Sequence, residues 1–327
     1  MYTRRDFTRL ALASLPAACA LEGSRVFGQA KPNSKVRGVM IGMNVPYNFG
    51  GRTAPVDEII QNCVKLGVSG VELRTQPVEA ALGVPANLVA QPGGGRNAAP
   101  PTAEVQAGRK AAAEELRKWR TSVSMDKVKA VRKKFENAGI LIEIVKVDGI
   151  FDMSDDVLDY EFQLAKTLGA RAISTEIVHN DPKRPGEATE KHGRIGKFAD
   201  KHKLMVGYHG HTETSPKEWE DAFKLAKYNG ANLDIGHFIA GNKTSPVPFL
   251  KQHHGRITHI HVKDKTRADV NVPFGQGDTP IKEVLQLIRD NKWPIQATIE
   301  FEYPVPAGSD RMTELQKCVD YCRAALA

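Results

Sequence analysis

A chain of 327 residues, 41% of them hydrophobic and 26% charged, has the composition of a folded globular protein, which argues against a disordered chain. Its formal net charge of +8 is not gathered into a dense Lys/Arg block with interleaved aromatic residues. The basicity therefore indicates a solvated surface or attraction to anionic substrates, and argues against a nucleic-acid-binding protein. No break in composition divides the chain, so we expect one domain after the N-terminal segment.

The first 30 residues have the pattern of an export signal. Arg4 and Arg5 precede a modest apolar run over residues 10–21, and small residues follow at a position that fits cleavage. The run is too short to span a bilayer, so no stable membrane insertion is expected. The sequence predicts a twin-arginine signal peptide over residues 1–30, a mature protein over residues 31–327, and a periplasmic or secreted location.

From residue 35 onward, short apolar runs alternate with segments whose apolar residues recur at helical spacing. Strands are expected over residues 36–43, 68–74, 140–147, 171–177, 204–208, 231–235, 257–262 and 296–301. Helices are expected over residues 56–66, 124–138, 155–168, 187–202, 216–226, 247–254, 281–288 and 311–326. Residues 76–106 interrupt this alternation, because they are rich in Gly, Pro and Ala; we expect a loop insertion there, followed by a charged helix over residues 107–120.

Eight strand-helix units in succession predict an α/β protein with a (β/α)8 TIM barrel as its single domain. A doubly wound α/β sheet would need a Gly-rich nucleotide-binding turn after the first strand. Asn44-Val45-Pro46-Tyr47 follows that strand and is not such a turn. In a barrel, the polar residues at the carboxyl ends of the strands form one ring around its mouth.

Polar clusters stand at these strand ends. They are Tyr208-His209-Gly210-His211, Asp234-Ile235-Gly236-His237, His259-Ile260-His261-Val262-Lys263-Asp264 and the acid Glu300. Alternate side chains of a strand share a face, so His209 and His211 are expected on one face. A single histidine often only caps a strand or satisfies a hydrogen bond of the core. Four such clusters at the same edge favour a metal or proton-transfer site instead.

These residues, with the loop Gly275-Gln276-Gly277, resemble the sugar phosphate isomerase/epimerase family of xylose isomerase-like barrels. The resemblance covers most of the chain after the signal. It implies that Asp234, in an Asp-x-Gly-His motif, and His261, the second histidine of His-x-His-x-Lys-Asp, ligate a divalent metal ion. It also implies that Glu300 is a ligand, with Glu302 as the second choice.

The sequence departs from the family at one ligand. Ketose 3-epimerases of the family have a metal-bound glutamate on the fifth strand, where this chain has His209. Either Glu176, at the end of the neighbouring fourth strand, supplies the missing oxygen, or His209 ligates directly. We favour Glu176, so the expected metal ligands are Glu176, Asp234, His261 and Glu300.

Three carboxylates and one imidazole suit a hard or borderline divalent ion, with Mn2+ as the first expectation and Mg2+, Co2+ or Zn2+ as alternatives. Such an ion polarises a sugar carbonyl and acidifies the neighbouring C–H, and a nearby base then moves the proton. His209 and His211 are the candidate bases, and Glu300 is also expected to be catalytic. The residues expected to bind substrate oxygens are His237, Lys263 and Glu302.

The sequence thus predicts a metal-dependent isomerase or epimerase of a sugar or keto-sugar, with a small-molecule carbohydrate as its partner. Two alternatives stay open: a lyase or hydrolase that acts on 3-keto-glycosides with the same site, and a non-catalytic periplasmic sugar-binding barrel. A nuclease like endonuclease IV would need further His and Glu ligands and a basic groove, which the sequence does not offer. Neither nucleic acid nor a membrane is an expected partner, and a homo-oligomer is compatible with the sequence.

Overall fold

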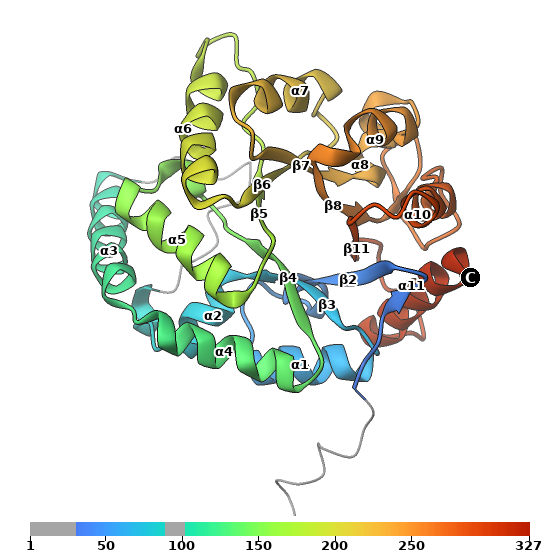
Figure 1. Cartoon of the computed structure of the whole chain (residues 1–327), viewed down its shortest axis with the longest axis horizontal. Helices are drawn as coiled ribbons and strands as arrows, with labels where there is room; N and C mark the ends of the chain where they lie inside the picture. The colour runs from blue at the N-terminus through green and yellow to red at the C-terminus, as the bar shows by residue number, and fades with distance from the viewer. Residues whose placement is uncertain (1–30, 89–101) are drawn as a thin grey trace, which may run out of the picture. The chain divides into compact units, whose positions relative to one another are not determined.

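Eight parallel strands close into a ring in the computed structural model, which describes residues 31–88 and 102–327 (Figure 1). Their order is β2-β11-β8-β7-β6-β5-β4-β3, and pairing of β3 with β2 closes the ring. The strands are β2 Val39–Val45, β3 Gly70–Arg74, β4 Leu141–Lys146, β5 Ala172–Glu176, β6 Met205–His209, β7 Asn229–Asp234, β8 Ile257–Val262 and β11 Gln296–Ile299. The predicted (β/α)8 TIM barrel is confirmed, and the predicted signal peptide lies outside the described residues.

Helices follow the strands and surround the ring (Figure 1). Those at the predicted places are α1 Val56–Lys65, α4 Met125–Asn137, α5 Asp155–Leu168, α6 Glu187–His202, α7 Pro216–Leu225, α9 Val247–His253, α10 Ile281–Asp290 and α11 Arg311–Leu326. Helix α7 begins with a capping box of Ser215 and Glu218, with Pro216 at its first position. None of the helices in the described part of the chain is long and apolar enough to cross a membrane.

The predicted loop insertion over residues 76–106 is wrong in part. Helix α2 Thr75–Ala81 follows β3 at once, a 3-10 turn covers Ala86–Leu88, and α3 Ala103–Ser122 begins inside the predicted loop. Pro77 lies in the first turn of α2, where a proline costs no helical hydrogen bond, and the helix is buried along Thr75–Glu79. Burial of α2 against the rest of the protein therefore favours a helix, although the Gly-, Pro- and Ala-rich composition predicted a loop. Residues 89–101 lie outside the described part.

Other elements also differ from the prediction. The first strand is divided, because positive φ angles at Arg37 (45°) and Gly38 (93°) turn the chain between β1 Lys35–Val36 and β2, which pair antiparallel. An additional helix, α8 Ile235–Asn242, follows β7 directly. Beyond β8, the short strands β9 Asp264–Lys265 and β10 Asn271–Val272 form a separate hairpin.

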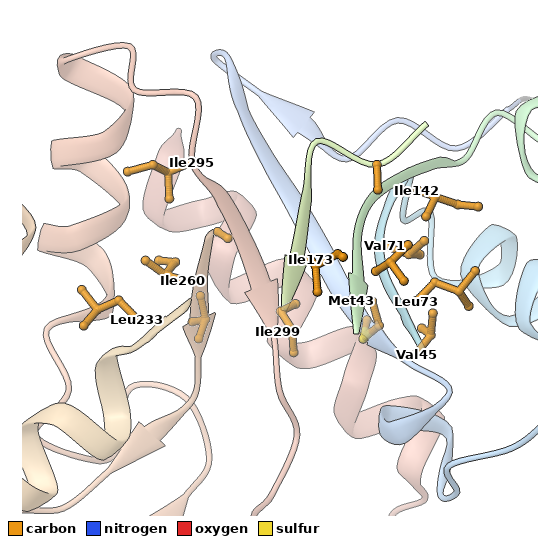
Figure 2. Packing of buried hydrophobic residues seen from close by; sticks show 14 of the residues in the cluster. Met43, Val45, Val71, Leu73, Ile142, Ile173, Leu233, Ile260, Ile295 and Ile299 are labelled. Carbon is orange, nitrogen blue, oxygen red and sulfur yellow. The ribbon is translucent and has the colours of Figure 1, made fainter. Parts of the chain in front are cut away.

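Strand side chains alternate between an apolar and a polar environment. Val71, Leu73, Ile260 and Ile299 belong to the buried apolar cluster that packs the strands against the helices (Figure 2). The alternate positions on the same and neighbouring strands carry buried polar side chains: Glu72, Asn232, His259, His261 and Thr298. The interior of the barrel is therefore polar, and its polar side chains continue to the carboxyl ends of the strands.

A buried ion cluster fastens α3 to α2 and α5. Arg120 donates to both oxygens of Glu79, at 2.7 and 3.2 Å, and its Nη2 lies 3.4 Å from Glu161 Oε1. Neither oxygen of Glu161 has a hydrogen-bond partner among the described residues. Burial raises the pKa of Glu161 to about 8, because the nearby Arg120 offsets only part of that effect and the charge of Glu79 adds to it.

This raised pKa predicts a dependence of stability on pH. A carboxyl whose folded pKa exceeds its unfolded value stabilises the protein fully below about pH 4.5, and this contribution is lost as the pH rises through about 8. Glu161→Gln removes the titration, so we expect its melting temperature to exceed that of the parent at pH 9, by roughly 2–4 °C for each kcal/mol. Thermal melts between pH 5 and 9 measure this difference, with the exposed Glu136→Gln as control. Parallel curves for parent and Glu161→Gln would contradict it.

Candidate metal centre

Four strand ends bring donor side chains to one point. The register pairs Asp234 on β7 with His261 on β8, and His209 ends the neighbouring β6. Glu300 follows β11, and its N–H donates to Val262 O at 3.0 Å. The side chains of His209, Asp234, His261 and Glu300 each offer one ligand atom, and these atoms all lie within 4.8 Å of one another. We call these four residues the metal group.

The donor chemistry of the metal group fits a divalent ion. His261 Nδ1 lies 3.0 Å from Glu300 Oε2 and 3.9 Å from Asp234 Oδ2, and His209 Nε2 lies 3.4 Å from the same oxygen of Asp234. All four side chains are buried, and buried carboxylates are costly unless a cation compensates them. Two carboxylates and two imidazoles suit Mn2+, Co2+ or Zn2+. This buried group could therefore hold a metal ion.

Glu176, the remaining predicted ligand, lies outside the metal group. Its Oε1 accepts from Lys146 Nζ at 2.6 Å, and its Oε2 lies 3.1 Å from His209 Nδ1 and 2.9 Å from His211 Nε2. Glu176 thus contacts the nitrogen of His209 that points away from Asp234. Of the two alternatives that the sequence left open, this geometry favours His209 as the direct ligand.

Lys263 supplies a positive charge at the same carboxylates. Its Nζ lies 2.7 Å from Glu300 Oε2, 2.7 Å from Glu302 Oε2 and 3.0 Å from Asp234 Oδ2. Burial alone would lower the pKa of Lys263, but these carboxylates outweigh it and hold the pKa well above its usual value. Burial would likewise raise the pKa of Asp234, yet Lys263 holds it below its usual range. The ammonium of Lys263 and the carboxylate of Asp234 are therefore both charged near neutral pH.

His237 is neutral and has a defined tautomer. It lies in the first turn of α8, which Asp234 caps by accepting from the N–H of His237 at 2.7 Å. Burial lowers the pKa of His237 to about 3. Lys263 Nζ donates to His237 Nε2 at 3.0 Å, so Nδ1 carries the proton and donates to Thr212 Oγ1, also at 3.0 Å. Thr212 in turn donates to Asp269.

A cavity of about 460 Å³ adjoins these residues. Glu302 and Tyr47 are part of its wall, and the Tyr47 hydroxyl donates to Glu302 Oε1 at 3.1 Å. Arg52 and Arg311 also line it. Glu302 is the residue that links the cavity to the site, because it lines the cavity and also contacts Lys263; none of the four residues of the metal group lines it.

Several residues of the site were missed by the sequence prediction. They are Glu72, whose Oε2 lies 2.6 Å from His261 Nε2, Asn44, which donates to Glu300 Oε1 at 2.9 Å, Lys146 and Thr212. Strand alternation puts Glu72 on the face opposite Val71 and Leu73, but nothing in the sequence points to its partner. The glycine-rich loop after β10 binds an anion of the protein itself, since the N–H groups of Gly275 and Gly277 donate to Asp264 Oδ2.

Residues 153–324 match the family described as "Xylose isomerase-like TIM barrel". An inosose dehydratase of Clostridium tetani is 27% identical over 134 residues, which cover 33% of this chain and 44% of that protein. The match thus spans less than half of the curated relative.

Two solved structures share the fold. A probable 3-DHS dehydratase from Bacillus anthracis has a TM-score of 0.58 and 14% identity, covering 86% of this chain and 99% of that one. The 3-keto-D-glucoside 4-epimerase from E. coli has a TM-score of 0.57 and 10% identity, covering 88% of this chain and 99% of that one. At these identities the likeness extends to the barrel and not to the reaction.

Proposed function

Since the chain belongs to the xylose isomerase-like TIM barrel family, we propose that it is a metal-dependent enzyme that abstracts a proton beside the carbonyl of a sugar or keto-sugar and so isomerises or epimerises it. The observation that carries this proposal is the buried metal group beside a partly exposed imidazole. His209, Asp234, His261 and Glu300 would hold the ion, with Mn2+ as the first expectation. When bound, the ion would polarise a carbonyl oxygen and acidify the neighbouring C–H.

His211 is the proposed base. It lies outside the metal group and is about one third exposed, so a substrate at the mouth can reach it. Its Nε2 donates to Glu176 Oε2 at 2.9 Å, and among the described residues Nδ1 has no hydrogen-bond partner. A carboxylate that accepts from one nitrogen of an imidazole fixes its tautomer and leaves the other nitrogen free to take a proton.

Lys263 is proposed to act on the substrate oxygens; His237, expected from the sequence to bind them too, has both ring nitrogens engaged and instead orients the ammonium of Lys263. The Lys263 ammonium stands between Glu300 and Glu302, beside the metal group, where a substrate hydroxyl or a developing negative charge would meet it. Neutral His237 accepts a hydrogen bond from the Lys263 ammonium at Nε2. We expect the remainder of the substrate to occupy the cavity along Glu302 and Tyr47.

Dehydration is a second candidate, favoured by the similarity to an inosose dehydratase. It begins with the same proton abstraction, and differs in that a hydroxyl on the next carbon leaves as water. In this reaction the Lys263 ammonium, which is held beside three acids, would stabilise the leaving oxygen. The product of the reaction separates the two candidates: a sugar isomer or epimer in the first case, an unsaturated or deoxy keto product in the second.

Proton exchange provides the test. The protein loaded with Mn2+ is incubated with a panel of keto-sugars and aldoses in D2O, and exchange of substrate C–H is followed by NMR. We expect exchange with at least one substrate, and His211→Gln should slow it by roughly two orders of magnitude or more. His211 lies outside the metal group but forms a second group of possible ligands with Glu176 and His209, so elemental analysis of the variant must show full metal content before slower exchange is assigned to loss of the base.

His253→Gln is the matched control, since His253 pairs with Glu220 at the outer helices at 3.1 Å. It should leave exchange unchanged. If a sugar of the panel binds but no compound of the panel shows exchange, the proposal of an enzyme is wrong and a non-catalytic sugar-binding barrel takes its place. Equal exchange by His211→Gln and the parent would assign the base to another residue.

A further inference from the structure

We propose that Glu72 is the positioning residue of the metal centre, and that it holds His261 in the tautomer and orientation that present Nδ1 to the ion. This inference rests on the proposed role of His261 as a ligand. The Oε2 atom of Glu72 lies 2.6 Å from His261 Nε2, and both side chains are at most 1% exposed. Glu72 is not a member of the metal group; with His259 and His261 it forms a separate buried group whose ligand atoms also lie within 4.8 Å of one another.

The two nitrogens of His261 face different partners. Nδ1 points to the metal group, 3.0 Å from Glu300 Oε2, whereas Nε2 points into the barrel toward Glu72. A ligating nitrogen must carry no proton, so in a neutral imidazole the proton has to sit on the other nitrogen. The carboxylates of Glu72 and Glu300 are both acceptors only, so each favours a proton on the nitrogen that it faces. When an ion takes the place of the proton between Nδ1 and Glu300, the hydrogen bond to Glu72 keeps the remaining proton on Nε2 and fixes the orientation of the ring.

The barrel is irregular at the positions that contact His261 from within. The pairing of β3 with β4 shifts its register between Val71 and Glu72, and the pairing of β7 with β8 shifts between Ala231 and Asn232. Asn232 is the second neighbour of His261 Nε2, with its Nδ2 at 3.0 Å; an amide NH2 only donates, so with a proton on Nε2 this is a packing contact and Glu72 is the acceptor. Such irregularities re-aim side chains in a sheet. Both side chains behind His261 thus stand at places where the strands depart from regular pairing.

Glu72 has little other reason to be charged in this place. Its Oε1 has no hydrogen-bond partner among the described residues, and its one further polar contact among them is His259 Nε2, 3.3 Å from Oε2. A fully buried carboxylate is costly, and apolar residues of similar volume often give equal or greater stability. We therefore attribute the buried charge of Glu72 to its contacts with the imidazoles of His259 and His261 on β8.

The test is the affinity for metal alone, without substrate. Glu72→Gln keeps the volume of the side chain but replaces the acceptor by an amide. We expect calorimetric titration with Co2+ to show roughly 10–100-fold weaker binding than the parent, as is typical when the carboxylate behind a ligating histidine is changed. The absorption bands of bound Co2+ should shift, because the geometry at His261 changes, and such a shift would not follow from a purely structural role.

Two variants complete the design. Glu72→Asp keeps the charge but withdraws it by one methylene, and we expect an intermediate loss of affinity; it also serves if Glu72→Gln does not fold. Glu143→Gln is the control, since this glutamate of β4 pairs with Arg171 at 2.8 Å, away from the metal group. It should bind Co2+ like the parent. Circular dichroism establishes that each variant is folded.

The outcomes separate this inference from the proposed function. If the parent binds Co2+ and the Glu72 variants bind it equally well with an unchanged spectrum, the role of Glu72 is overturned and the metal-dependent function stands. If the parent binds no divalent ion at all, the proposed function and this role fall together.

Discussion

Replacing Asp234 by asparagine is expected to reduce the affinity for a divalent ion by at least about three orders of magnitude, since a ligand should matter more than the outer partners whose loss costs roughly 10–100-fold. Asp234 is fully buried, and its Oδ2 faces His209 at 3.4 Å. Asparagine keeps the size of the side chain and an oxygen that can cap α8 at the N–H of His237, so the change is chiefly one of charge. Calorimetry and elemental analysis of the dialysed protein measure the effect.

Proton exchange with the substrate should disappear together with the metal in Asp234→Asn. The surface variant Asp221→Asn is the control, because the ion pairs of Asp221 within the described residues are with two lysines of its own helix, Lys217 and Lys224. It should leave both metal content and exchange unchanged. Stoichiometric metal in Asp234→Asn would move the ion away from the β7 end and would contradict the assignment of the metal group.

The barrel could be predicted because its elements carry strong periodic signals. Helices α5, α6 and α11 have the predicted bounds, and each presents an apolar face to the strands while its other face is charged. Helix α8 lacks such a signal, because six of its eight residues are buried and no polar face marks it. Helix α2 was missed for a related reason: its burial depends on packing that composition does not reveal.

The site could be predicted as far as strand ends determine it. Asp234, His261 and Glu300 come together because parallel strands in register bring their carboxyl ends to one level. The choice between Glu176 and His209 as the metal ligand depended on the position of each side chain and on the residues that it contacts. Lys146, from the neighbouring strand, holds one oxygen of Glu176 at 2.6 Å, and no spacing in the sequence predicts that contact.

Contacts between side chains across the barrel could not be predicted from the sequence. Glu72 and His261 are 189 residues apart and belong to strands that are not neighbours in the ring. Alternation gives the face of each residue but not which residues meet in the interior, because that depends on the tilt and local irregularities of the strands. The roles of the polar residues inside this barrel could therefore be assigned only from the distances between their side chains.

Replacing Lys263 by methionine is expected to make the stability of the protein depend on metal. The ammonium of Lys263 is 2% exposed and contacts three acids, Asp234, Glu300 and Glu302. Removing one partner of a buried ion pair leaves uncompensated charge and costs about 3–5 kcal/mol. For a domain of this size we expect the melting temperature of the metal-free variant to fall on the order of 10 °C.

A divalent ion should reverse much of this loss, because it would neutralise the same carboxylates. The stabilisation on adding Mn2+ should therefore be larger in Lys263→Met than in the parent, and the affinity for the ion should be equal or higher, since the ammonium no longer competes for Asp234 Oδ2 and Glu300 Oε2. This is the opposite of the change expected for Asp234→Asn, although both variants remove one charge from the same cluster.

Thermal melts with and without Mn2+ measure the effect of Lys263→Met. Lys224→Met, which removes a lysine that is 70% exposed and pairs with Asp221 at 3.0 Å, is the control and should change neither melt. An unchanged melting temperature of metal-free Lys263→Met would mean that the acids around it are protonated or solvated. A variant that is destabilised but gains nothing from Mn2+ would show that the carboxylates stabilised by Lys263 are not those that bind the ion.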